Sequence, residues 1–230
     1  MIKVAPINIT AIIQARMTSK RLPGKILHEV SGKPLLKYLT DSLACSKKLS
    51  NIIIATSDQC EDNIVEDFCI KNSVSCIRGS LNNVVDRFVM AIKKCNCDAF
   101  IRLSGDSPLL DHRLIDQAIN LYETHKVKIV SNVLHRTFPK GQSIELFDSK
   151  IFLDNVNNIY LESDREHVTP YFYRNKDNFE IYNFISTGNF SSIQLSVDTP
   201  DDLKKFETLI LKLKKPHFEY SYQDFISLIN

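Results

Sequence analysis

Short apolar runs alternate with amphipathic stretches over the first 131 residues of the chain. The apolar runs are bounded by polar or turn-forming residues, and they predict strands over 7–14, 51–56, 75–77, 99–103 and 128–131. Between them, apolar residues recur at helical spacing, which predicts helices over 34–46, 61–72, 82–95 and 112–125. This alternation is typical of an α/β fold with a parallel sheet and right-handed crossovers.

The rhythm changes at about Asn132. Segment 132–185 combines a polar loop (135–142), a short apolar run (143–147), a helix-like stretch ending near Tyr173 and an expected strand over 180–185. We interpret it as an inserted lobe within a single domain of residues 1–230. The chain then returns with an apolar run over 193–197, Asp198, and Thr199-Pro200-Asp201-Asp202, a strong helix start before the apolar pattern of 203–213.

Composition narrows the class of protein. The chain has 230 residues, 43% of them hydrophobic, which suits one large domain, and its net charge of only +2 argues against a general nucleic-acid surface. The start of the sequence lacks a signal-peptide pattern, and no run approaches the roughly 18 apolar residues typical of a membrane span. The six cysteines form no zinc-binding set, so we expect free thiols in a reducing cytoplasm.

The positive charge is concentrated near the start of the chain. Residues 1–48 hold nine Lys or Arg against two acids, and Arg16, Lys20, Arg21 and Lys25 share one loop after the first expected strand. The carboxyl ends of strands are where open α/β sheets bind ligands. The loop lacks the GxxxxGK[ST] and GxGxxG patterns, yet its cations and Gly24 are sufficient to clamp a polyphosphate. A solvated surface of scattered lysines is the alternative.

Two aspartates follow buried runs elsewhere in the chain. Asp106 comes after Gly105 at the end of the 99–103 strand, and Asp198 comes after the 193–197 run. Each also fits a turn or a helix cap. Beside a cationic loop, two such carboxylates predict Mg²⁺ bound next to a triphosphate.

At these residues the sequence resembles a known family, the cytidylyltransferases that activate acidic sugars, such as the acylneuraminate and 3-deoxy-manno-octulosonate cytidylyltransferases. It looks most like the spore-coat polysaccharide SpsF-like branch. The resemblance runs over nearly the whole chain and rests on QARMTSKRLPGK (14–25), ATSD (55–58), RGSLNNVVDR (78–87), RLSGDSPLLD (102–111), DREHVTPY (164–171) and SVDTPDDL (196–203). It implies a Rossmann-like fold of the nucleotide-diphospho-sugar transferase type, with a mixed, mostly parallel sheet flanked by helices. It also implies CTP and Mg²⁺ as co-reactants and a homodimer.

The resemblance assigns roles to individual residues. Those matching the family's triphosphate loop are Arg16, Ser19, Arg21 and Lys25. Those that hold the nucleoside or shape its pocket are Arg78, Gly79, Ser80, Asp86 and Arg87. Asp106 and Asp198 match the two metal-binding aspartates, and the catalytic set is Arg16, Lys25 and Asp106.

The sugar site is expected at the lobe. His167 and Tyr171 match a His and a Tyr, one helical turn apart, that face the sugar in the octulosonate enzymes, and Gln142 and Glu145 lie where a sugar could sit. A satisfied core histidine is the alternative for His167. Ser104 stands where some octulosonate enzymes place a glutamine near the sugar, which leaves the identity of the sugar open.

The implied reaction is attack of a sugar hydroxyl on the α-phosphorus of CTP, giving a CMP-sugar and pyrophosphate for surface polysaccharide biosynthesis. Two alternatives stay open: transfer to another sugar phosphate or polyol phosphate, and a non-catalytic nucleotide-binding module. Segment 132–185 is also expected to carry a dimer interface, because aromatic and arginine side chains crowd there. These are Tyr160, Arg165, Tyr171, Phe172, Tyr173 and Arg174. The alternative is that the aromatics pack the lobe against the sheet.

Overall fold

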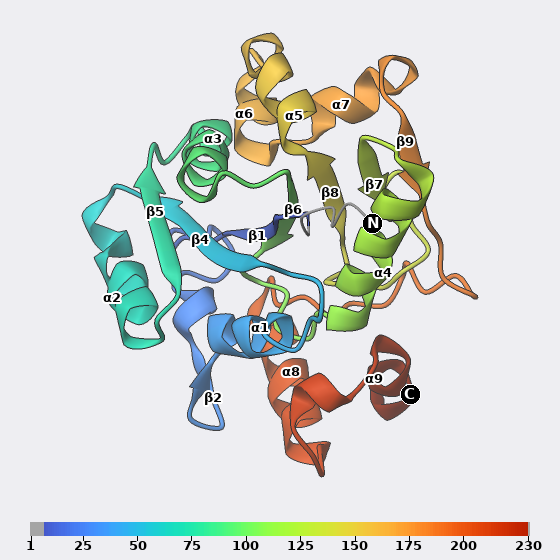
Figure 1. Ribbon diagram of the computed structural model, residues 1–230. Helices are drawn as coiled ribbons and strands as arrows, with labels where there is room; N and C mark the ends of the chain where they lie inside the picture. The colour runs from blue at the N-terminus through green and yellow to red at the C-terminus, as the bar shows by residue number, and fades with distance from the viewer. Residues whose placement is uncertain (1–6, 230) are drawn as a thin grey trace, which may run out of the picture.

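The computed structural model describes residues 7–229, and a seven-stranded sheet lies at its centre in the order β5-β4-β1-β6-β8-β7-β9 (Figure 1). The strands are β1 (Ile9–Gln14), β4 (Asn51–Ser57), β5 (Ser75–Gly79), β6 (Ala99–Ser104), β7 (Ile129–Ser131), β8 (Glu145–Asp148) and β9 (Ile181–Asn183). A separate hairpin pairs β2 (Glu29–Val30) with β3 (Lys33–Pro34). Only β8 is antiparallel to its neighbours in the seven-stranded sheet, so the sheet is mixed and mostly parallel, as predicted.

Helices cover both faces of this sheet. The α-helices are α1 (Leu35–Leu43), α2 (Asn63–Lys71), α3 (Val84–Cys95), α4 (His112–His125), α5 (Ser149–Asn155), α6 (Glu162–His167), α7 (Pro170–Arg174), α8 (Pro200–Lys212) and α9 (Tyr222–Ile229). Short 3-10 turns are η1 (Lys25–Leu27), η2 (Cys60–Asp62), η3 (Val156–Asn158), η4 (Lys176–Asn178) and η5 (His217–Glu219). Side chains of β1 alternate between two cores: Ile13 packs with residues of α1, α2 and α4, and Ile12 packs with those of α3, α5 and α7.

The predicted strands and helices of the first 131 residues are present, with ends that differ by a few residues. The helix expected over 34–46 is shorter, because α1 ends at Leu43. The 193–197 run is not a strand of the sheet: its one ladder contact is an isolated bridge between Lys140 and Gln194. The helix start at Thr199 is confirmed by a capping box in which Thr199 and Asp202 satisfy each other's backbone N–H groups.

Segment 132–185 is continuous with the sheet at its inner side. It supplies β8, which lies between β6 and β7, and β9, which pairs with β7. Its outer part consists of α5, α6 and α7, which gather at the top of the view in Figure 1. Within residues 7–229, no helix is long and apolar enough to cross a membrane.

Candidate active site

The loop after β1 is folded tightly around one carbonyl group. The backbone oxygen of Met17 accepts hydrogen bonds from the N–H groups of Ser19 and Gly24, at 2.9 and 2.8 Å. Gly24 has φ +73°, a left-handed conformation that glycine adopts without strain. Asp62, which is fully buried, accepts the Met17 N–H at 2.6 Å and so ties the loop to the end of β4. The cationic side chains therefore start from a fixed backbone.

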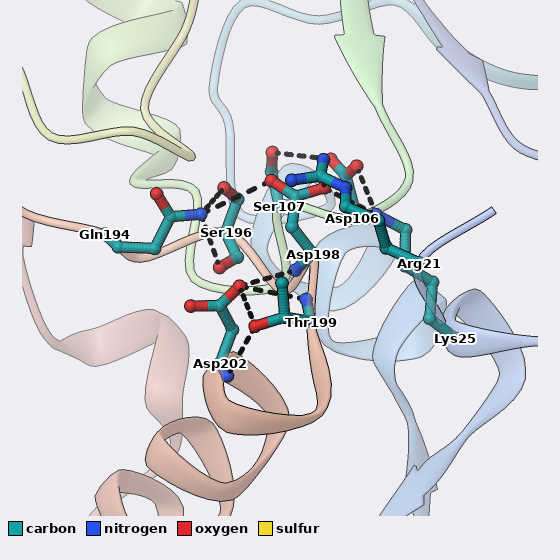
Figure 2. A network of polar contacts seen from close by, with 9 residues as sticks. All are labelled: Arg21, Lys25, Asp106, Ser107, Gln194, Ser196, Asp198, Thr199 and Asp202. Carbon is teal, nitrogen blue, oxygen red and sulfur yellow. Dashed lines mark hydrogen bonds and ion pairs between the residues drawn. The ribbon is translucent and has the colours of Figure 1, made fainter. Parts of the chain in front are cut away.

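Lys25 joins Asp106 and Asp198, as Figure 2 shows. Its Nζ lies 2.7 Å from Asp106 Oδ2 and 2.9 Å from Asp198 Oδ1, and Arg21 Nη2 lies 2.9 Å from the same Asp198 oxygen. Burial by itself would raise the pKa of Asp198, but the charges of Lys25 and Arg21 outweigh it and hold the pKa below its ordinary value. Asp198 is thus ionised near neutral pH, and the two carboxylates share one buried cation, the Lys25 ammonium.

Neither aspartate serves as a helix cap. Thr199 is the N-cap of α8, and the Asp202 carboxylate accepts the backbone N–H of Asp198 at 3.1 Å, which leaves the Asp198 side chain free to face Lys25. Gly105 lets the loop of Asp106 approach the end of β1, because a Cβ at Gly105 would lie 3.1 Å from the Cβ of Ala15. The metal-ligand interpretation of these residues is therefore compatible with the local backbone, and the capping alternative is not.

A first cleft of about 450 Å³ opens at this edge of the sheet. Five of its lining side chains are cationic: Arg16, Lys20, Arg21, Lys25 and Arg87. The acids lining it are Asp106, Glu166 and Asp198. Arg16 Nη2 lies 2.8 Å from Glu166 Oε1, so α6 reaches the cationic loop across the cleft. The surplus of cations suits a polyanion.

A second cleft of about 510 Å³ adjoins the first, and the two share Ser104, Asp106, His167 and Asp198. On its floor Arg102 and Glu145 form a buried ion pair across the β6–β8 ladder, and Tyr173 Oη donates to Glu145 Oε1 at 2.8 Å. Burial, and then the charge of Glu145, raise the pKa of Tyr173 well above its ordinary value, so the phenol stays protonated. Glu145 is thus satisfied within the protein.

Two cations on the wall of the second cleft have no acidic partner. Arg136 donates only to the hydroxyl of Ser143, at 3.1 Å from each Nη, and neither Arg136 nor Lys140 forms an ion pair among residues 7–229. The loop that carries them is fixed. Gly141 has φ +93°, and a Cβ there would lie 2.6 Å from the backbone N of Ser196, so the loop lies directly against the chain that leads to Asp198.

The structure brings together most of the predicted site residues. Those that line the first cleft are Arg16, Ser19, Arg21, Lys25, Arg87, Asp106 and Asp198. Glu145 lines the second cleft, and His167 lines both. Residues from 16 to 198 thus converge at the carboxyl ends of β1 and β6.

Gln142 does not belong to the sugar site, which corrects the prediction. Its side chain is fully buried, Oε1 accepts the N–H of Asp111 at 2.9 Å, and Nε2 donates to the carbonyl of Leu109 at 2.7 Å. Because the Gln142 side chain has no exposed surface and lines neither cleft, it does not reach a ligand bound there. Its two hydrogen bonds attach the loop that carries Arg136 and Lys140 to the backbone of Leu109 and Asp111.

Tyr171 does not line the sugar site either, contrary to the prediction. Its ring packs on Phe172 and Phe179, its hydroxyl lies 3.4 Å from Asn155 Oδ1, and it lines neither cleft. The expected one-turn spacing from His167 fails because α6 ends at His167, Val168 has φ +70°, and α7 begins only at Pro170. The helix break brings Tyr173, instead of Tyr171, into the second cleft.

The 78–80 segment lies outside the first cleft. Arg78 pairs with Glu66 at 2.8 Å and donates to two backbone carbonyls, and Ser80 Oγ accepts the N–H of Asn83 at the start of α3. Gly79 acts indirectly. A Cβ at Gly79 would lie 3.1 Å from Cγ of Arg87, so the glycine leaves room for the Arg87 side chain, which lines the first cleft. Direct nucleotide contact by Arg78, Gly79 and Ser80 is therefore not supported.

Sequence reasoning missed several residues of the clefts. These are Gln14, Glu166, Arg102, Arg136, Lys140 and Tyr173. Arg136 and Lys140 could have been predicted from the sequence, since they lie in a polar loop next to the expected sugar site. Arg102 and Tyr173 did not, because their placement depends on the pairing of β6 with β8 and on the break at Val168.

The carboxylate pair fits a divalent cation of the hard type. Among residues 7–229 there is no cluster of three or more His, Cys, Asp or Glu side chains that could form an all-protein metal site. Mg²⁺ does not need one, because it is usually held by one or two carboxylates together with substrate phosphates. Asp106 and Asp198 are the residues that could hold it, and Lys25 lies between them.

A Rossmann-like α/β sheet with a cationic loop and two paired carboxylates at one edge is the arrangement of a nucleotidyltransferase. The family model for cytidylyltransferases matches residues 10–224. This chain belongs to the cytidylyltransferase family and is a CTP-dependent nucleotidyltransferase.

Known proteins of similar sequence or structure agree with this assignment. The chain is 32% identical to the spore coat polysaccharide biosynthesis protein SpsF of Bacillus subtilis, over 97% of this chain and 94% of that protein. It is 31% identical to an 8-amino-3,8-dideoxy-manno-octulosonate cytidylyltransferase of Shewanella sp. (strain ANA-3), over 73% of this chain and 65% of that protein. A solved cytidylyltransferase from Leptospira borgpetersenii superposes with a TM-score of 0.90 at 32% identity, covering 97% of this chain and 94% of that one.

Proposed function

We propose that this enzyme transfers CMP from CTP to an acidic sugar of the sialic-acid or 3-deoxy-octulosonate type, releasing pyrophosphate. The observation that carries the proposal is the meeting of two clefts at Asp106, His167 and Asp198. One cleft is rich in cations, as a triphosphate requires, and the other is a separate space for an acceptor. Bound side by side, the two substrates would react at the shared wall.

An acidic acceptor is favoured by the unpaired cations of the second cleft. Arg136 and Lys140 have no acidic partner among the described residues, whereas the cations of the first cleft are mostly paired. A guanidinium and an ammonium group on a fixed loop can bind a carboxylate through charge-assisted hydrogen bonds. The names of two relatives agree, since one is a spore coat polysaccharide biosynthesis protein and the other acts on an octulosonate sugar acid.

The work of the protein in this reaction is positioning and electrostatics. A sugar hydroxyl oxygen attacks the α-phosphorus, the bond from that phosphorus to the bridging oxygen of the β-phosphate breaks, and the hydroxyl proton is released to solvent. Arg16, Arg21 and Lys25 offset the negative charge that pyrophosphate carries away. Mg²⁺ held by Asp106 and Asp198 would supply further charge stabilisation. In-line geometry comes from holding both substrates at one wall.

We also infer a cytoplasmic homodimer whose interface includes the outer part of segment 132–185. Tyr160 and Leu161, two adjacent residues just before α6, are 72% and 43% exposed, so they place neighbouring apolar side chains on the surface of this segment. Phe172 and Tyr173 do not support this surface, because Phe172 is buried in the core and Tyr173 lines the second cleft. Light scattering at tens of micromolar protein tests the inference, and an active monomer would refute it.

Two rival functions are separated by one experiment. Transfer to a neutral sugar phosphate would use the first cleft in the same way, and a non-catalytic module would bind nucleotide without turnover. Pyrophosphate release should be measured with CTP, UTP, ATP and GTP, each with a panel of sugar acids and sugar phosphates. We expect release only with CTP and a sugar acid; release with a sugar 1-phosphate, or none at all, would favour a rival.

A further inference from the structure

Three acids line the first cleft, and only two of them fit a metal ion. Asp106 and Asp198 share Lys25 and are the pair that could hold Mg²⁺. Glu166, on α6, is the third acid. Within residues 7–229 no three acidic side chains lie close enough together to form a metal-binding cluster, so Glu166 is not grouped with the two aspartates. Its carboxylate is therefore left outside the metal site.

The one partner of Glu166 is the guanidinium of Arg16. Glu166 Oε1 accepts from Arg16 Nη2 at 2.8 Å, and neither side chain forms another hydrogen bond or ion pair within residues 7–229. The Glu166 side chain is 45% exposed, so the pair spans the open cleft. Asp62, which fixes the same loop, differs: it is fully buried and accepts the backbone N–H groups of both Met17 and Ser57. Glu166 is not anchored in this way and can leave Arg16 by rotation of its own side chain.

The backbone on either side of Glu166 is fixed. Asp164 is buried, and its carboxylate accepts hydrogen bonds from both Nη atoms of Arg174, one of them at 2.9 Å. The carbonyl of Asp164 also accepts the N–H of Val168, which is fully buried. Glu166 thus lies between two residues that are attached to the core. A Glu166 carboxylate that leaves Arg16 therefore stays within reach and can pair with it again.

The function proposed above places a triphosphate against Arg16, and the inference drawn here rests on that placement. A divalent cation at Asp106 and Asp198 would offset the charge of those two acids, but it leaves the charge of Glu166 uncompensated beside the phosphates. We propose that Glu166 is a resident competitor of the triphosphate. It pairs with Arg16 between turnovers, is displaced by a phosphate group when CTP binds, and pairs with Arg16 again as pyrophosphate leaves.

The proposed competition affects only ligands that carry phosphates. CTP and pyrophosphate must both break the ion pair, so the pair lowers the affinity of the cleft for both by the same factor. Five cationic side chains line the cleft, and they favour retention of pyrophosphate after the reaction. The return of Glu166 to Arg16 removes one of these contacts and so speeds release. Cytidine has no phosphate, so its affinity is independent of Glu166.

Calorimetric titration of the full chain with CTP and with pyrophosphate, each with Mg²⁺ and without acceptor, tests the proposal. Glu166→Gln keeps the size and removes the charge, and it should tighten binding of both ligands by about fivefold, the upper end of the range for partly exposed ion pairs. The matched control is Glu162→Gln, which removes one charge from an exposed position of the same helix outside both clefts, and should leave both affinities unchanged. In an Arg16→Ala background, Glu166→Gln should have no more effect than this control.

Three results would overturn the proposal. Weaker CTP binding in Glu166→Gln would mean that Glu166 holds Arg16 in position for the phosphates. An unchanged affinity would mean that nothing is displaced. A gain that persists in the Arg16→Ala background would show a general effect of charge. A different failure is CTP affinity that is unchanged in Arg16→Ala alone, which would refute the placement of the triphosphate itself. Thermal unfolding of each variant verifies that it is folded.

Discussion

The two adjoining clefts differ in how their charges are satisfied. In the first, Lys25 is paired with Asp106 and Asp198, and Arg21 is paired with Asp198. In the second, Arg136 and Lys140 have no acidic partner within residues 7–229. The same sheet edge thus holds one site in which Lys25 and Arg21 are paired with carboxylates and one in which the cations of the 136–140 loop are not.

The difference indicates what each cleft binds. On the function proposed above, a triphosphate in the first cleft would draw Lys25 and Arg21 away from the carboxylates, and a divalent cation held by Asp106 and Asp198 would then balance the charge of these carboxylates. A ligand of the second cleft needs only one negatively charged group to form ion pairs with Arg136 and Lys140. On the proposed function, the paired charges of the first cleft suit a nucleotide bound with a divalent cation, and the unpaired cations of the second cleft suit a single anionic group.

The largest effect is expected from the carboxylates of the first cleft. Asp106→Asn and Asp198→Asn should each lower kcat by about a hundredfold or more, because an amide is a poor Mg²⁺ ligand and leaves Lys25 with one partner fewer. Steady-state pyrophosphate release over a range of Mg²⁺ concentrations measures this.

The matched control for these variants is Asp224→Asn, which changes a carboxylate that accepts the Ser221 N–H at 2.7 Å at the start of α9. It should cost about 1 kcal/mol of stability, as other lost caps do, with activity retained. If instead Asp106→Asn and Asp198→Asn melt earlier and keep full turnover, the two aspartates are structural and the comparison of the clefts fails.

The cations of the first cleft should have the next largest effect. Arg16→Ala and Lys25→Ala should each raise the KM for CTP by roughly tenfold to a hundredfold, the range expected for a charge-assisted contact to phosphate, with a much smaller change for the sugar. Lys48→Ala, whose exposed ammonium pairs with Glu123 elsewhere, serves as the control. Unchanged CTP affinity in both cleft variants would remove this loop from the nucleotide site.

The second cleft should respond in the opposite way. Arg136→Ala or Lys140→Ala should raise the KM for the acidic sugar by about tenfold and leave the KM for CTP unchanged, since each removes one contact to a single anionic group. Lys150→Ala, at an exposed pair with Asp154 on α5, is the control. A parallel rise in both KM values would show that the two clefts are not separate in function.

The smallest expected effect is the pH dependence of stability. The pKa of Asp198 is lower in the folded chain than in the unfolded one, so between those two values the unfolded chain binds more protons. The stabilising contribution of Asp198 is complete above its unfolded pKa, about 4, and is lost as the pH falls through the folded value. Urea unfolding from pH 6 to pH 3 should therefore show that the free energy of unfolding falls more steeply for wild type than for Asp198→Asn. Parallel pH dependences of the two proteins would count against the contact between Asp198 and Lys25.

Local sequence patterns were sufficient for part of the first cleft. Strand β1 ends where the apolar run ends, and Asp106 follows the end of β6, so Lys25 and Asp106 could be placed at one sheet edge from parallel-sheet geometry. Asp198 follows a buried run that is not a strand of the sheet, so its place beside Lys25 depends on tertiary contacts that this geometry does not give. The motifs of the cytidylyltransferase family added the identity of the nucleotide.

The second cleft depends on contacts that no local pattern contains. Its floor joins Arg102 to Glu145 only because β8 enters the sheet antiparallel between β6 and β7. Tyr171 was chosen over Tyr173 on the assumption of an unbroken helix, which the backbone of Val168 interrupts. Gln142 was misjudged because its partner at Leu109 lies 33 residues earlier in the chain.

The central claim, that CTP in the first cleft reacts with an acidic sugar in the second, is tested most directly by the mass of the product. Wild-type enzyme, CTP, Mg²⁺ and 3-deoxy-manno-octulosonate or a sialic acid should give one CMP-sugar for each pyrophosphate released, and omission of the sugar should stop pyrophosphate release. A product that retains two phosphates between cytidine and sugar would contradict the claim, and so would pyrophosphate release that does not depend on the sugar.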